Sequence, residues 1–114
     1  MLMKNKFNLI FKKRRHWFSV DYDCYTKYPN HEYARLASKL RLMSPNECVG
    51  LIESINDADN GLYYEEVFLL DADSASDDDE IHISPPNIII DKTITISFFD
   101  MKMLLHEWID FRVK

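Results

Sequence analysis

The stretch Ile94-Thr-Ile-Ser-Phe-Phe-Asp-Met-Lys-Met-Leu-Leu-His-Glu-Trp-Ile-Asp-Phe111 decides the fold, because its pattern changes from strand to helix at Ser97 or an adjacent residue. Thr93–Ser97 is rich in β-branched residues, which favours a strand. From Ser97 onward apolar residues recur at helical spacing, and Asp100 lies near the helix N-terminus, where the dipole favours an acidic residue. The predicted buried stripe is Met101, Leu104, Leu105, Trp108 and Phe111, and the predicted outward residues are Asp100, Lys102, His106, Glu107 and Asp110. This helix is expected to pack across a sheet.

Two further helices are predicted before it. Ser44-Pro45-Asn46-Glu47 places Ser at the N-cap, Pro at the first helical position and Glu at the third, which is a capping box. Its buried stripe is Cys48, Leu51, Ile52 and Ile55, and Asn56–Gly61 ends it, with Gly61 suited to a left-handed turn. The preceding helix, with Asn30 as its N-cap, has the stripe Tyr33, Leu36, Ala37 and Leu40, with Arg35, Lys39 and Arg41 off the stripe.

The strands are predicted from β-rich runs. Phe7–Lys12 and His16–Tyr22, separated by Lys13–Arg15, are expected to form a hairpin or two neighbouring strands. Leu62–Leu70 is expected to be one strand, with Tyr63, Glu65, Val67 and Leu69 on one face and Tyr64, Glu66, Phe68 and Leu70 on the other. Ile81–Ile83 ends at Pro85-Pro86, since proline cannot donate to a ladder. Asn87–Ile90 and Thr93–Ser97 form either a hairpin around Asp91-Lys92 or a single bent strand.

These elements predict one α+β domain over residues 1–114. It comprises a mostly antiparallel sheet of about five strands, two central helices and a C-terminal helix packed on the sheet. The length of 114 residues suits one core without staples. Cys24 and Cys48 form no CxxC pair and are expected to be thiols of a reducing compartment. The apolar run Phe7–Phe11 is too short for a secretory signal, and no stretch is long enough to span a membrane, so the expected location is the cytoplasm.

Charge is distributed unevenly along the chain. Residues 1–41 carry ten Lys/Arg and three Asp/Glu, a balance of +7, whereas residues 42–114 carry four and sixteen, a balance of −12. The segment 71–80 alone holds six carboxylates, and such a run is too costly to bury. It is therefore expected to be a solvated loop that steers a cationic protein partner.

Catalytic and metal-binding signatures are weak. The spacing of Asp71, Asp73 and Asp77 is similar to a calcium loop, but Ser76 stands where the glycine belongs and His82 where the glutamate belongs. His106 and Asp110 lie one helical turn apart with no third zinc ligand in evidence. Two glycines cannot build a phosphate cradle, and no nucleophile motif is present. The sequence therefore predicts no enzyme activity, no cofactor and no metal.

A nucleic-acid role is the alternative. Lys12-Lys13-Arg14-Arg15 precedes His16, Trp17 and Phe18, and basic residues with aromatic neighbours can hold phosphates and stack bases. The net charge of −5 opposes such binding. A nucleic-acid-associated or regulatory adaptor that uses this N-terminal hairpin is accordingly the second hypothesis.

The segment 94–111 resembles the close of small bacterial immunity proteins, in which a last strand leads through a short polar turn into a Leu-Leu-x-x-Trp-Ile helix. In particular the chain is similar to immunity proteins of contact-dependent growth inhibition systems. The resemblance implies a cytoplasmic protein that binds and neutralises a cognate toxin C-terminal domain, often a basic nuclease. The residues expected to bind that partner are Tyr63, Tyr64, Glu65, Glu66, Asp71, Asp73, Asp77, Asp78, Asp79 and Glu80.

Overall fold

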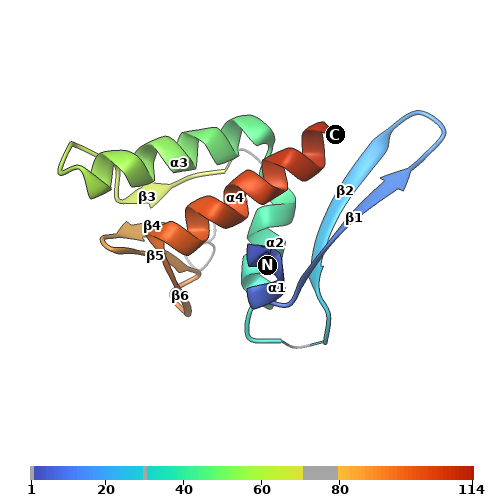
Figure 1. The fold of residues 1–114 in the computed structure, drawn as a ribbon, viewed down its shortest axis with the longest axis horizontal. Helices are drawn as coiled ribbons and strands as arrows, with labels where there is room; N and C mark the ends of the chain where they lie inside the picture. The colour runs from blue at the N-terminus through green and yellow to red at the C-terminus, as the bar shows by residue number, and fades with distance from the viewer. Residues whose placement is uncertain (1, 30, 71–79) are drawn as a thin grey trace.

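The computed structural model describes residues 2–29, 31–70 and 80–114, which form four helices and six strands (Figure 1). The helices are α1 (Met3–Lys6), α2 (Ala34–Leu42), α3 (Pro45–Asp59) and α4 (Phe98–Val113). The strands are β1 (Leu9–Arg15), β2 (Val20–Thr26), β3 (Val67–Phe68), β4 (Ile81–Ser84), β5 (Asn87–Ile90) and β6 (Ile94–Ser97).

The α+β class is confirmed, and every strand pairing is antiparallel, but the strands divide into two sheets. One is the ribbon β1–β2, and the other is the meander β3-β4-β5-β6. The expectation of one sheet of about five strands is therefore wrong in arrangement. A physical reason is that β2 buries only Cys24, so the ribbon has too little apolar surface to extend the meander.

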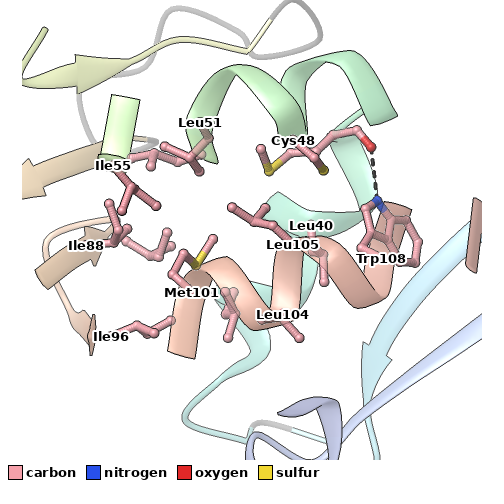
Figure 2. Close-up of a cluster of buried hydrophobic side chains, with 14 of the residues drawn as sticks. Leu40, Cys48, Leu51, Ile55, Ile88, Ile96, Met101, Leu104, Leu105 and Trp108 are labelled. Carbon is pink, nitrogen blue, oxygen red and sulfur yellow. Dashed lines mark hydrogen bonds between the residues drawn. The ribbon is translucent and has the colours of Figure 1, made fainter. Parts of the chain in front are cut away.

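The core lies around α4, which Figure 2 shows between α3 and the strands β5 and β6. The predicted stripe Met101, Leu104, Leu105 and Trp108 is fully buried, and Phe111 packs against its edge. The indole N–H of Trp108 donates to the Met43 carbonyl oxygen at 3.0 Å, which fixes α4 to the residue after α2. Phe11 of the ribbon meets the Trp108 ring edge-on at 4.9 Å, so the ribbon is fastened to the same helix.

Two of the three predicted helix starts are present. Ser44 and Glu47 form the reciprocal capping box of α3, with side chains accepting from each other's backbone N–H at 3.1 Å. Ser97 caps α4 by accepting from the Asp100 N–H at 3.1 Å. The helix expected near Asn30 begins at Ala34, and Asn30 itself lies outside the described residues.

The first hairpin turns later than predicted. Lys13–Arg15 belong to β1, and the turn is His16–Ser19, closed by the His16 N–H donating to the Ser19 carbonyl at 2.8 Å. Cross-strand charge explains this register, because Arg14 lies opposite Asp21 and Lys12 opposite Asp23. Basic residues therefore extend the strand here where a turn was expected.

β5 and β6 form a hairpin around Asp91-Lys92, so the alternative of a single bent strand is wrong. Ile90 pairs with Ile94, and both Asp91 (φ 50°) and Lys92 (φ 62°) are left-handed, as a type I′ turn requires.

Lys39 was expected outside the apolar stripe of α2, but it is buried at 3% exposure. Its Nζ lies 3.6 Å from an Asp91 carboxylate oxygen, so an ion pair explains the burial.

The short helix α1 is a further addition. Glu107 was expected to face outward, yet its carboxylate accepts from the backbone N–H groups of Met3 and Lys4 at 2.6 and 2.9 Å. Asp100 is likewise held by Lys6 Nζ at 2.6 Å. The carboxylates of Glu107 and Asp100 therefore hold α1 against α4.

Candidate functional site

The predicted partner-binding residues begin where α3 ends. Gly61 has φ +72°, the Leu62 N–H donates to the Asp57 carbonyl at 2.8 Å, and the Gly61 N–H donates to the Ala58 carbonyl at 3.3 Å. These bonds form a Schellman motif, which reverses the chain after the helix. The segment 62–66 then runs back to β3, the edge strand of the meander.

Leu62–Leu70 is mostly irregular and is not the long strand that was expected. Only Val67 and Phe68 are in the strand, and the Glu66 carbonyl accepts from the Ile83 N–H at 2.7 Å. Burial nevertheless alternates along most of this segment. Tyr63, Glu65 and Leu69 are exposed, while Tyr64 and Phe68 are half-buried and Leu70 is buried. Two residues depart from this alternation, because Glu66 is exposed and Val67 is half-buried.

Tyr63 is the most exposed aromatic residue of this segment, at 81%. Its hydroxyl donates to Glu65 Oε1 at 3.0 Å, and this hydrogen bond, together with the carboxylate charge, raises the pKa of Tyr63. Leu62 and Leu69 are also largely exposed, at 58% and 77%. A large aromatic ring and two aliphatic side chains therefore stand in solvent beside two carboxylates, which is the composition of a contact surface with a polar rim.

Two carboxylates that sequence reasoning did not assign to the site lie on the other side of the Gly61 turn. Asp57 and Asp59 occupy the last turn of α3, where no basic residue is present. The negative end of the helix dipole disfavours acidic residues there. The sequence therefore offered a signal for these two residues, because carboxylates that are unfavourable for the helix indicate another role. We call Asp57, Asp59, Tyr63, Glu65 and Glu66 the acidic edge.

The remaining predicted residues are only partly described. Asp71, Asp73, Asp77, Asp78 and Asp79 lie outside the described residues, as does most of the run that was compared with a calcium loop. Glu80 is half-buried before β4, with its carboxylate 3.8 Å from His82 Nδ1. Its carbonyl accepts from the Asp91 N–H at 2.8 Å, so Glu80 is held to the residue after β5.

The alternative site is the tip of the β1–β2 ribbon, which Figure 1 shows projecting at the opposite end of the molecule from the Gly61 turn. Trp17 and Phe18 are 90% and 93% exposed, with ring centroids 6.3 Å apart. His16 Nε2 lies 2.8 Å from an Asp21 carboxylate oxygen and Arg14 lies 3.4 Å from Asp23. Part of the basic charge of the ribbon is thus neutralised within it.

The groups considered for catalysis and metal binding are dispersed. His106 and Asp110 are both exposed on α4, and no three His, Cys, Asp or Glu side chains of the described residues lie together as metal ligands. Burial raises the pKa of both Cys24 and Cys48 to about 12. Both thiols therefore stay protonated near neutral pH, which makes them poor nucleophiles.

No helix among the described residues has the length and apolar character needed to cross a membrane. Comparison with known proteins places the chain in no family. No family model, no curated protein and no solved structure matches it.

Proposed function

We propose that this chain is a binding protein of the immunity class, which neutralises a basic toxin domain in the cytoplasm by forming a stoichiometric complex. The observation that carries the proposal is the acidic edge, where exposed Tyr63 lies beside Glu65 and Glu66. The resemblance of segment 94–111 to immunity proteins supports the same class. The proposal assigns no catalytic step to the chain.

The two kinds of group at the acidic edge have separate tasks. The carboxylates, with those of the run 71–80, attract a cationic surface from a distance and raise the association rate. Tyr63, Leu62 and Leu69 supply the apolar contact that slows dissociation. The hydrogen bond from the Tyr63 hydroxyl to Glu65 at 3.0 Å favours one orientation of the ring, which lowers the cost of ordering it on binding.

The proposal predicts that the reading frame immediately upstream encodes the toxin domain, and the test measures association of that domain with the chain by stopped flow at several salt concentrations. The double variant Glu65→Gln with Glu66→Gln, and the triple Asp→Asn variant across 77–79, should each slow association and flatten its salt dependence. Glu53→Gln is the matched control, because Glu53 is an exposed glutamate on α3 outside the acidic edge. Equal rates and salt slopes in all variants would rule out steering by these residues.

A second candidate function is the nucleic-acid-associated or regulatory adaptor. The near-complete exposure of Trp17 and Phe18 on a basic ribbon favours it, because such rings can stack on unpaired bases. Filter binding to single-stranded RNA and DNA at low salt distinguishes the two functions. Binding that is lost in Trp17→Ala supports the adaptor, and no retention of either nucleic acid excludes it.

A further inference from the structure

The tip of the β1–β2 ribbon presents two large aromatic side chains to solvent. Trp17 and Phe18 are the middle residues of the His16–Ser19 turn and are almost fully exposed, and Val20 beside them is exposed as well. Figure 1 shows this turn projecting away from the helices, so that a flat surface can meet the tip end-on. Adjacent exposed apolar side chains on a projecting turn indicate a contact surface.

The strand register separates the charges of the ribbon between its two faces. Residues directly opposite each other in an antiparallel pair share a face. Lys13 lies opposite Tyr22, and Arg15 lies opposite Val20. Both carboxylates of the ribbon lie opposite basic residues of the other face. Across the ribbon, all of which the structure describes, one face therefore carries two cations and no carboxylate.

Arg15 is the residue of β1 nearest the turn, and its position suits contact with an anionic surface. Its side chain is exposed and makes no hydrogen bond or ion pair with any other described residue. A strand rises about 3.3 Å per residue, so Arg15 lies about 7 Å behind Trp17 and Lys13 about 13 Å behind it. Apolar side chains that bind at a bilayer surface enter it by about 5–10 Å. When the Trp17 ring is inserted to that depth, Arg15 lies at the level of the lipid headgroups.

We propose that the tip of the ribbon docks on the surface of an anionic phospholipid bilayer. Trp17 and Phe18 enter the boundary between headgroups and acyl chains, where aromatic side chains are favoured. Arg15 and Lys13 contact the anionic headgroups. This surface lies at the opposite end of the molecule from the acidic edge, so the inference goes beyond the immunity function proposed above and does not depend on it.

The net charge of −5 does not prevent this contact, because the charges are separated in space. The acidic edge and the tip lie at opposite ends of a molecule whose longest dimension is 45 Å. At physiological salt, the interaction between exposed charges is screened over a Debye length of about 8 Å. The bilayer therefore interacts mainly with the residues at the tip.

The tip also carries the second candidate function, but its ring geometry favours a bilayer over a nucleic acid. The Trp17 and Phe18 rings lie edge-on, with an interplanar angle of 76° and centroids 6.3 Å apart. Successive bases of a single strand stack on the faces of aromatic side chains, and two edge-on rings offer no parallel pair of faces to them. A bilayer requires no mutual orientation of the rings, because each ring enters it separately.

The experiment mixes the full chain with vesicles at low salt and records tryptophan emission and co-sedimentation. The chain has two tryptophans, and Trp108 is fully buried, so a blue shift reports on Trp17. Vesicles of phosphatidylcholine with phosphatidylserine should produce the shift and carry the chain into the pellet. Vesicles of phosphatidylcholine alone should bind at least about fivefold more weakly, because they lack the anionic headgroups.

Two variants test the two kinds of contact, each with a matched control. Trp17→Ala with Phe18→Ala should weaken sedimentation about tenfold or more, because the buried aromatic area is lost. Phe99→Ala removes a ring that is 66% exposed on α4, away from the ribbon, and should have no effect. Arg15→Glu should weaken binding about fivefold or more, since each basic residue at an anionic surface contributes about that factor. Lys27→Glu makes the same change of charge at an exposed position at the other end of the ribbon and should have little effect.

Four outcomes would overturn the proposal, provided that circular dichroism shows each variant folded. These are no binding to the phosphatidylserine vesicles, equal binding to both kinds of vesicle, equal losses in Arg15→Glu and Lys27→Glu, or release of the chain from vesicles by single-stranded RNA at a nucleotide concentration below that of the accessible lipid. Glu65→Gln with Glu66→Gln should leave vesicle binding unchanged. The failure of the tip and the failure of the acidic edge are therefore observed separately.

Discussion

The buried ion pair between Lys39 and Asp91 gives the sharpest prediction for stability. The two side chains are only 4% and 5% exposed, and Lys39 Nζ lies 3.6 Å from Asp91 Oδ1. Asp91→Asn removes the carboxylate charge and keeps a residue that tolerates the left-handed φ of 50° at this position. Any effect on stability therefore comes from charge and not from the turn.

The magnitude follows from the distance. At an effective dielectric of about 20, unit charges 3.6 Å apart attract by roughly 4–5 kcal/mol before desolvation is counted. Removing one partner of a buried pair typically costs about 3–5 kcal/mol. We expect Asp91→Asn to lower the free energy of unfolding by about 3 kcal/mol and the midpoint temperature by more than about 10 °C.

Urea denaturation followed by circular dichroism provides the measurement. Arg35→Ala is the control, because Arg35 reaches the same carboxylate at 3.5 Å but is 56% exposed, so its loss should cost no more than about 1 kcal/mol. The reasoning is refuted if Asp91→Asn changes stability by less than about 0.5 kcal/mol, or if Arg35→Ala costs as much as Asp91→Asn.

Three further predictions concern the turn, the thiols and the acidic edge. Lys92→Gly should stabilise the fold by about 1 kcal/mol, because a lysine at φ 62° pays a steric penalty that glycine avoids; a lower melting temperature would contradict this. The folded pKa of Cys24 and Cys48 is raised to about 12 from 9.0, so their contribution to stability is complete below pH 9 and is lost as pH rises towards 12. By pH 10 the loss should be about 1 kcal/mol per cysteine, measured as the difference in pH slope between the parent and each Cys→Ala variant; parallel slopes would count against it. Asp59→Asn should raise stability by about 0.3–1 kcal/mol by removing a carboxylate from the C-terminal end of α3, while slowing association with the partner; thermal unfolding and stopped flow check the two effects, and a loss of stability would show that the dipole argument is wrong.

The sequence predicted those elements whose signals are local. The capping box at Ser44, the cap at Ser97 and the buried stripes of α3 and α4 depend on residues within a few positions of one another. Local spacing determines such features before any tertiary contact forms.

The predictions from sequence fail where contacts between residues far apart in the chain determine the structure. Lys39 is buried because Asp91 meets it from another part of the chain, and Glu107 turns inward because α1 presents two backbone N–H groups to it. The register of the ribbon depends on charges facing each other across strands, which no single-strand pattern reveals.

Co-expression with the C-terminal domain encoded immediately upstream tests the central claim most directly. The proposed function predicts that this domain alone arrests growth and that the chain restores growth through a one-to-one complex. Glu65→Gln with Glu66→Gln should weaken that protection and slow association at low salt, while Glu53→Gln should not. If the upstream domain is harmless, or if the chain forms no complex with it, the proposal that this protein is an immunity protein is contradicted.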